Sequence, residues 1–590
     1  MKYPFYQLAL FTLLLISPVT LFAYDTFKVA VSDTLVYNLP SGKNQYWQVK
    51  GAQTNVVVAL YKNGKLAKVQ DESKGINSVE RVWVEQEKKS TYQLKVWANM
   101  FLKEFRAYDV EINPMPDWKP LPTVINAQSL HEDLQAYIAI KRDAHIGTYL
   151  YRTEQYMDSV YNELAKSIDQ KEISIIDFYK NIARLSGLEG SCHNFTRLPN
   201  HLPYYFPLGD HYIPLTVKYN NGHLLHMSSE SDLPKGAVIL SINDIPAKSI
   251  IDNLTQLITT DGFSQPYKYV GAFTRNWLNY YHIHYGIASQ YKIHYEWQGK
   301  RFTTHLKGIS YEQAISAQEK QNNKPDSPRY SFNRLEHNLY LLKITGFDFA
   351  GSKEDPAYAL FEDFLETMMD TLEKNPGASL VTDLRGNMGG AGVLYEKTFT
   401  YLADRAFRDS DFAFSQFNNL LHTQYFNLDE IFISNHLTTI EAGNNVLTER
   451  FPKGVAGRYY LADHHNPLIL PNKRTFKGQQ YLLINSYVAS AAAHLASLIK
   501  SYTNAIVIGE ETMGGYYEHV GHLPFSYTLP NSHVQIGFSV VYVKQDADIL
   551  PDQDPGSGVK PHHQLLLSHE EAISETDFHL EKVRELFMRR

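Results

Sequence analysis

The chain has 590 residues, a formal net charge of −7 and 20% charged residues. This weakly acidic composition, without a block of lysine or arginine, argues against nucleic acid as a partner. A hydrophobic content of 44% is ample for several packed cores, and the length predicts about three or four domains. The single cysteine, Cys192, excludes an internal disulfide.

Residues 1–23 predict a secretory signal peptide. Lys2 supplies a positive charge, and an apolar run follows from Leu8 to Ala23. The run is too short and too close to the terminus for a typical membrane span. We therefore expect a periplasmic or secreted protein with no stable membrane insertion after cleavage. An uncleaved anchor is the alternative, because Leu21 is not the ideal small residue before the cleavage point.

Residues 24–113 alternate apolar and polar side chains in short runs, which predicts an all-β sandwich as an accessory domain. Lys62-Asn-Gly-Lys65 has the composition of a hairpin turn. Residues 114–127 contain a proline-rich linker of extended character. The pattern becomes helical over 128–194, and this segment ends at Cys192 and His193.

Residues 195–325 are a mixed region whose clearest fragment lies at 233–246, followed by a predicted helix over 249–258. The fragment resembles the second half of a PDZ-type module, in which Gly236 opens a strand and Asn243-Asp244 turns it. PDZ domains bind peptide C-termini by strand addition. No carboxylate-binding loop of the Gly-Leu-Gly-Phe type precedes the fragment, so a peptide-binding role and a purely structural role both stay open.

Residues 326–570 predict an α/β core, followed by a C-terminal helix over 571–590. An amphipathic helix leads into a buried strand that ends in the turn Asp383-Leu-Arg-Gly-Asn-Met-Gly-Gly390. Such a glycine-rich turn lets the backbone approach a ligand closely, and it lacks the spacing of a nucleotide-binding loop. An insertion over 392–477 separates this turn from the next buried strand.

That next strand, over 481–485, breaks at Ser490 into a helix of small residues. The arrangement puts a hydroxyl at the positive end of a helix dipole, with backbone N–H groups free to bind an oxyanion. Acyl-transfer enzymes present a nucleophile in this way. Ser490 as a simple helix cap is the alternative, because serine is a common N-cap residue.

Together these motifs resemble the C-terminal processing, or tail-specific, serine peptidases. The family's three ordered motifs stand here as Asp383-Leu-Arg-Gly-Asn-Met-Gly-Gly390, Ser490-Ala491 and Gly509-Glu-Glu-Thr-Met-Gly514. The strand over 337–347 and Gly558-Val-Lys-Pro561 resemble its opening strand and its closing motif. The resemblance covers about 180–565 and implies a multidomain α+β protein with an α/β peptidase core, no metal and no organic cofactor.

The sequence departs from the best-known members at Gly515, where they carry the lysine of a Ser-Lys dyad. A serine hydroxyl is a poor nucleophile without a positioned base. The tricorn-core-like branch of the family supplies a histidine from an upstream segment and a carboxylate from near the C-terminus. His193 occupies the upstream place and is the candidate base. His494, one helical turn after Ser490, is a rival whose side chain would point along the helix.

The resemblance implies an acid shortly before Gly558-Val-Lys-Pro561, and Asp554 fits that place best, one residue out of register. Asp548 and Asp552 stay open. The acid orients the imidazole and stabilises its cationic form. Cys192 beside His193 invites a cysteine-protease interpretation, but adjacent residues rarely present both side chains to each other. A small buried apolar role is therefore favoured for Cys192.

The sequence thus predicts an exported serine endopeptidase that acts on a protein or peptide substrate through an acyl-enzyme. The expected oxyanion donors are the N–H of Ala491 and that of Gly389 or Gly390. A catalytically inactive peptide-binding or scaffold protein of the same fold is the alternative. Hydrolysis of a non-peptide ester or amide would use the same residues.

Overall fold

The computed structural model describes residues 25–589, apart from gaps at 31–32, 41–44, 53, 71–78, 85, 88, 102–106, 116–122, 170–171, 200–204, 207–208, 230–231, 323–327 and 427–438. The chain divides into two compact units, Met1–Pro120 and Leu121–Arg590. The predicted signal peptide and most of the proline-rich stretch lie outside the described residues. In the described part of the chain, no helix is long and apolar enough to cross a membrane.

The first unit consists of two four-stranded antiparallel sheets. One has the order β1 (Asp25–Ala30), β8 (Ala107–Met115), β3 (Gln45–Ala52), β6 (Val79–Val84). The other has the order β2 (Leu35–Asn38), β7 (Tyr92–Phe101), β4 (Thr54–Lys62), β5 (Lys65–Gln70). Alternate residues of each sheet, such as Val49 and Val58, join one apolar cluster. The predicted hairpin turn is present, because Lys62 pairs with Lys65 across Asn63 and Gly64, both at positive φ.

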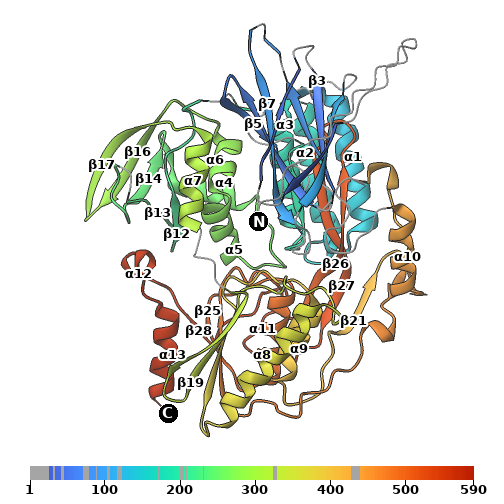
Figure 1. Cartoon of the computed structure of the whole chain (residues 1–590), viewed down its shortest axis with the longest axis vertical. Coiled ribbons are helices and arrows are strands. Elements are labelled where there is room, and N and C mark those ends of the chain that lie inside the picture. Colours follow the sequence, from blue (N-terminus) through green and yellow to red (C-terminus); the bar gives the residue numbers. More distant parts are fainter. Residues whose placement is uncertain are drawn as a thin grey trace, which may run out of the picture. The chain divides into compact units, whose positions relative to one another are not determined.

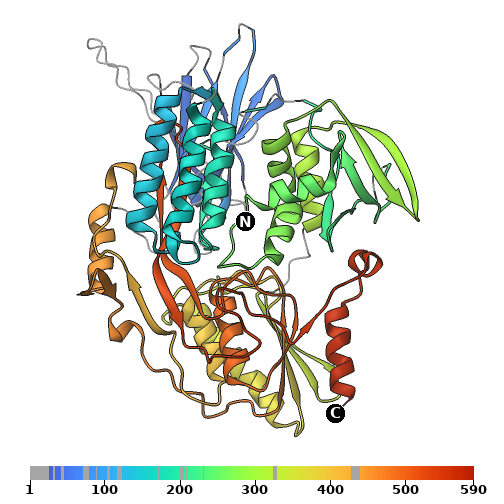
Figure 2. The same cartoon turned by 180° about the vertical axis from the view of Figure 1, so that it is seen from behind.

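The second unit begins with a short strand β9 (Val124–Ile125), which pairs with β10 (Ile173–Ser174), and a layer of helices. These are α1 (Ala127–Ala144), the 3-10 turn η1 (Ile146–Tyr149), α2 (Glu154–Asp169) and α3 (Ile175–Leu188). Apolar residues spaced three or four apart on α1, such as Leu130, Leu134 and Tyr137, are fully buried. Figure 2 shows α1, α2 and α3 side by side, in cyan to teal. The loop 189–194 follows α3 and carries His193.

A region of strands and helices follows. Its strands are β12 (Val217–Asn220), β13 (His223–His226), β14 (Val238–Ile242), β15 (Ile245–Pro246), β16 (Gln290–Trp297) and β17 (Lys300–Lys307). They form an antiparallel sheet with the order β12-β13-β14-β16-β17, and β15 pairs with β14. The helices of the region are α4 (Ala247–Thr255), α5 (Pro266–Val270), the π-helical turn η3 (Gly271–Arg275), α6 (Trp277–Tyr285) and α7 (Tyr311–Asn322). Asn243 and Asp244 form the predicted turn at positive φ.

The peptidase-like core is a six-stranded sheet with the order β18-β19-β20-β24-β25-β28. The strands are β18 (Tyr330–Glu336), β19 (Leu339–Ile344), β20 (Ser379–Asp383), β24 (Gln479–Ile484), β25 (Ile506–Gly509) and β28 (His563–Gln564), parallel except for β18. One face is covered by α8 (Pro356–Glu373), α9 (Gly392–Thr400) and α11 (Ala491–Tyr502), the other by α13 (Phe578–Met588) (Figure 1). Because both faces are covered, β20 and β24 are buried throughout.

A second sheet joins the helical layer to this core. It contains β11 (Phe195–Arg197), β27 (Gln535–Gln545), β21 (Ser410–Ser415), β23 (Arg458–Tyr460) and β22 (Lys453–Val455), with β26 (Glu518–Thr528) paired to β27. The insertion supplies β21, β22 and β23, and it also carries η4 (Thr423–Tyr425), α10 (Ile440–Arg450) and η6 (Asp463–His465). A short helix, α12 (His569–Ile573), precedes α13. Because β11 follows His193 directly and pairs with β27, this sheet brings the loop 189–194 to the core.

Candidate active site

Ser490 lies immediately before α11, at the carboxyl end of the buried strand β24. Its φ of 49° is in the left-handed region, which a non-glycine residue adopts only at some conformational cost. The side chain makes no capping hydrogen bond to the helix. The simple capping role is therefore absent, and the hydroxyl is available at the end of a sharp strand-to-helix turn.

The glycine turn lies beside Ser490, because β20 and β24 are neighbouring parallel strands whose carboxyl ends meet at one edge of the sheet. Gly389 has a φ of 101°, and a Cβ built on it would lie 2.7 Å from the Cβ of Ser490 and 3.0 Å from the backbone N of Ala491. A side chain at Gly389 would therefore collide with the serine turn.

The backbone donors of the glycine turn differ in their hydrogen bonding. The N–H of Gly389 donates to Oδ1 of Asn387 at 2.9 Å, and the Asn387 side chain donates in turn to the carbonyl oxygen of Ile344. Within the described part of the chain, the N–H groups of Gly390 and Ala491 have no acceptor. Of the three predicted oxyanion donors, Gly390 and Ala491 are therefore free and Gly389 is engaged.

His193 meets Ser490 across the site. Nε2 of His193 lies 3.2 Å from Oγ of Ser490, within hydrogen-bond reach. The rival His494 turns elsewhere: its Nδ1 lies 3.7 Å from Oδ1 of the partly buried Asp409, and its ring stacks on Tyr395. The structure thus brings together the predicted base and the predicted nucleophile, which are 297 residues apart in the sequence.

A fully buried charge cluster holds the loop 189–194 in place. Glu189 accepts hydrogen bonds from Nζ of Lys141 at 2.7 Å, from the hydroxyl of Tyr137 at 2.8 Å and from the side chain of Asn194 at 2.6 Å. Burial raises the pKa of Glu189, but the charge of Lys141 and the hydrogen bond to His145 outweigh it and hold the pKa at about 2. Glu189 and Asn194 bracket His193 in the sequence, so the loop is tied to α1 through Glu189 and closed on itself by the bond from Asn194 to Glu189.

The structure does not place Asp554, the predicted acid, beside His193. Asp554 forms an ion pair with Lys560, and 74% of its side chain is exposed. The two alternatives are also engaged elsewhere, since Asp548 pairs with Arg405 and Asp552 pairs with Lys500. The closing segment instead packs its backbone against the Gly509–Gly514 motif, with the N–H of Val559 donating to Thr512. An acidic turn near a motif can serve solubility and packing as readily as catalysis.

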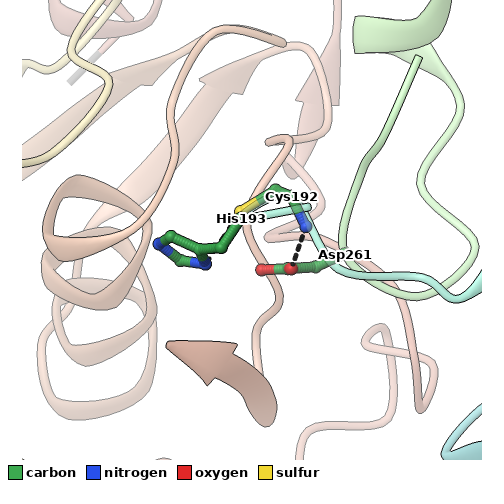
Figure 3. A group of neighbouring side chains, drawn as sticks. All are labelled: Cys192, His193 and Asp261. Atoms are coloured by element: carbon green, nitrogen blue, oxygen red, sulfur yellow. Dashed lines mark hydrogen bonds between the residues drawn. The ribbon is translucent and has the colours of Figure 1, made fainter. Parts of the chain in front are cut away.

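Asp261 is the carboxylate beside His193, and sequence reasoning missed it. It lies in the loop after α4 and is 1% exposed. Its two oxygens accept from the N–H of Cys192 at 2.8 Å and from the N–H of Gly515 at 3.0 Å. Burial raises the pKa of Asp261, and the nearby His193 acts in the opposite direction. Figure 3 shows the carboxylate and the imidazole on the same side of the Cys192 backbone.

Cys192 also differs from expectation, because its side chain does face that of its neighbour. Its Sγ lies 3.6 Å from Nδ1 of His193. Burial raises the pKa of the thiol well above its usual value, and the negative charge of Asp261 adds to the effect. The thiol is therefore neutral near pH 7. The ligand atoms of Cys192, His193 and Asp261 all lie within 4.8 Å of one another (Figure 3).

The crowding at Gly515 explains why the chain lacks the lysine of a Ser-Lys dyad at this position. A Cβ at this position would lie 2.2 Å from the carbonyl oxygen of Glu518, so no side chain fits there. The Gly515 N–H instead holds Asp261. The site thus consists of a serine with an approaching imidazole, a buried carboxylate behind the imidazole, and two free backbone donors next to the serine. This is the constellation of a serine-type hydrolase.

Comparison with known proteins agrees with that class. Residues 339–562 match the model of peptidase family S41. The chain therefore carries an S41 peptidase domain, and this match supports a serine-type peptidase. No curated protein matches the sequence.

Solved structures share the fold. Mature CPAF is 14% identical with a TM-score of 0.52, and the match covers 78% of this chain and 97% of that one. Mature CPAF complexed with lactacystin is 14% identical with a TM-score of 0.54, over 78% of this chain and 98% of that one.

Proposed function

We propose that the protein is an exported serine endopeptidase in which His193 and Ser490 carry out acyl transfer on a peptide bond. The observation that carries this proposal is the 3.2 Å approach of His193 Nε2 to Ser490 Oγ. His193 removes the hydroxyl proton as Ser490 attacks the substrate carbonyl, and then delivers that proton to the leaving amine. Water hydrolyses the acyl-enzyme with the same imidazole as base.

The backbone N–H groups of Ala491 and Gly390 bind the oxyanion of each tetrahedral intermediate. Both lack an acceptor in the described structure, and Ala491 is the first residue of α11, so its N–H is at the positive end of the helix dipole. Gly389 contributes space, because its missing side chain lets the turn approach Ser490. A preorganised pair of donors of this kind stabilises the transition state more than the substrate.

Asp261 takes the role that the sequence suggested for Asp554. Its buried carboxylate stabilises the imidazolium that forms when His193 holds the serine proton. No direct hydrogen bond joins the two side chains, so the contribution is mainly electrostatic, through the nearby charge or through one bridging water. Burial raises the pKa of Asp261, but the charge of His193 lowers it, and this second effect supports the pairing of the two side chains.

The remaining parts of the chain suggest export and substrate handling. The apolar segment near the terminus supports secretion to the periplasm or beyond. We interpret the two-sheet first unit as a β-sandwich accessory domain and the region 195–325 as a PDZ-like module. Proteins or peptides are the proposed substrates, and no metal is needed for the chemistry.

The test is active-site labelling of the mature protein with a fluorophosphonate, which phosphonylates an activated serine. We expect one labelled residue, Ser490, and loss of labelling in Ser490→Ala. Ser497→Ala, two helical turns further along α11, is the matched control and should label like the wild type. Failure of the wild-type protein to label would support the inactive scaffold, while labelling without cleavage of unfolded protein substrates would point to a non-peptide ester or amide.

A further inference from the structure

The side chains behind the imidazole form a group of three different metal-ligand types. A thiol, an imidazole nitrogen and a carboxylate come from Cys192, His193 and Asp261, with the three ligand atoms within 4.8 Å of one another (Figure 3). The group faces Nδ1 of His193, whereas Ser490 faces Nε2. The two nitrogens of the His193 ring therefore contact different neighbours.

The spacing of the sulfur and nitrogen atoms suits zinc. A tetrahedral ion with Zn–S of about 2.3 Å and Zn–N of about 2.0–2.1 Å separates these two ligand atoms by about 3.6 Å. The Sγ of Cys192 and Nδ1 of His193 are 3.6 Å apart. A carboxylate oxygen of Asp261, within 4.8 Å of both atoms, would be the third ligand, with water as the fourth. Thiolate and imidazole together favour Zn²⁺ over Mg²⁺ or Ca²⁺.

The charge on Asp261 is a second and independent indication. Glu189, the other buried acid of this region, is paired with Lys141. No lysine or arginine pairs with Asp261 in the described part of the chain, where its oxygens accept from the backbone N–H groups of Cys192 and Gly515 and interact with the neutral thiol of Cys192. A buried carboxylate without a cation is costly unless a positive charge reaches it. A divalent ion on the Nδ1 side of His193 would supply that charge.

We propose that Cys192, His193 and Asp261 bind Zn²⁺ and that the bound ion switches the peptidase off. On binding, the thiol loses its proton to solvent and becomes the thiolate ligand. The ion takes the lone pair of Nδ1, so the neutral imidazole carries its proton on Nε2. That nitrogen then donates toward Ser490 and cannot accept the serine proton. The inhibitory part of this inference rests on the proposed role of His193 as base, whereas the binding part does not.

A second group, Glu449, His464 and His465, provides an internal comparison. Its ligand atoms also lie within 4.8 Å of one another, but it lacks sulfur, and Glu449 and His464 are exposed. Any ion bound there would give no thiolate signal. The variant His465→Ala removes this group without touching the active site, which makes it the matched control for both measurements below.

The binding test uses the mature protein carrying Ser490→Ala, which prevents self-cleavage, titrated with Co²⁺. We expect a near-ultraviolet thiolate-to-cobalt absorption band that saturates at one equivalent and is displaced by Zn²⁺. The band should persist in the His465→Ala background and disappear in the Cys192→Ser background. Absence of the band from the parent protein, or its survival in Cys192→Ser, would overturn the proposal whatever the catalytic activity.

The inhibition test measures turnover against Zn²⁺ concentration, with each variant normalised to its own metal-free rate. We expect inhibition of the wild type that a chelator reverses. In Cys192→Ser the Zn²⁺ concentration that halves turnover should rise at least about tenfold, since even loss of an outer partner of a metal ligand lowers metal affinity roughly 10–100-fold. His465→Ala should respond like the wild type. A saturated thiolate band with undiminished turnover would overturn the inhibitory role, and the base assignment would be withdrawn with it. If the protein has no turnover at all, the cobalt band still tests the site.

Discussion

The nucleophile and the base reach this site by different routes. Ser490 and the turn ending at Gly390 follow neighbouring parallel strands of one sheet, so a short local pattern positions both. His193 belongs to a loop after α3 and comes to the core through β11 and β27. Its loop is anchored by the fully buried Lys141–Glu189 pair, whereas the ion pair of the glycine turn, between Arg385 and Asp383, keeps Arg385 partly exposed.

The two sides of the site are therefore held in place by different kinds of interaction. The nucleophile side depends on missing side chains and backbone conformation, because a Cβ added to Gly389 would lie only 2.7 Å from the Cβ of Ser490. The base side depends on buried charge, because Glu189 holds the loop that carries His193. Changes on the first side should therefore lower turnover more than stability, whereas changes in the Glu189 cluster should lower stability more than turnover.

The largest expected effect is that of His193→Ala. Loss of the imidazole should lower kcat by on the order of 10⁴-fold or more, as for other catalytic histidines that act together with a serine. His464→Ala, at an exposed histidine outside the site, is the control and should keep nearly full turnover. Steady-state kinetics on a peptide substrate measures both. Comparable rates for the two variants would mean that His193 is not the base.

Gly389→Val should come next. The added side chain would collide with the Cβ of Ser490, and the disturbed turn should lower kcat by on the order of 10²–10³-fold, similar to loss of an oxyanion donor. Gly351→Val is the control, because a Cβ there meets nothing within 4 Å. Circular dichroism should give the same fold for both, with a lower Tm for Gly389→Val because of the collision and the positive φ. Full turnover in Gly389→Val would remove the turn from the mechanism.

Asp261→Asn tests the acid. We expect a loss of about a hundredfold in kcat/KM, smaller than the roughly 10⁴-fold seen where an aspartate bonds the histidine directly. Asp554→Asn, at an exposed ion pair, should change kcat/KM less than about twofold, as expected for a surface ion pair. If the larger loss occurred in Asp554→Asn, the sequence-based assignment would be correct after all.

Glu189→Gln should affect stability more than chemistry. Breaking the buried pair with Lys141 should cost about 3–5 kcal/mol, whereas Asp158→Asn, which breaks the exposed pair of the adjacent Arg142, should cost less than about 1 kcal/mol. Denaturant unfolding measures both. Equal costs would show that the loop is held by something other than this cluster.

The effect of Glu189→Gln should also depend on pH. The folded pKa of Glu189 is about 2, below its ordinary value of 4.5. The carboxylate therefore stabilises the fold fully above about pH 4.5, and this contribution is lost as the pH falls toward 2. The wild type should lose its advantage over Glu189→Gln across that window. A constant difference from pH 7 to pH 2 would contradict the assigned pKa.

The nucleophile side of the site could be predicted from the sequence, whereas the base side could be predicted only in part. Ser490 and the glycine turn are encoded by contiguous residues, so strand, turn and helix patterns located them. His193 came from the order of motifs along the chain. Asp261 left no such trace, because it lies in an ordinary loop and its burial depends on packing against Gly515 and Cys192, which are distant in sequence. The aspartates near residue 554 were favoured because composition cannot distinguish a surface turn from a catalytic acid.

The lack of space at Gly515 limits which substitutions this site can accept in evolution. A lysine introduced there would collide with the backbone of Glu518, and the N–H that fixes Asp261 would be displaced with it. The Ser-Lys solution and the Ser-His solution are therefore mutually exclusive on this backbone. A single substitution at residue 515 therefore cannot convert one arrangement into the other, because the backbone at Glu518 and the partner of Asp261 would also have to change.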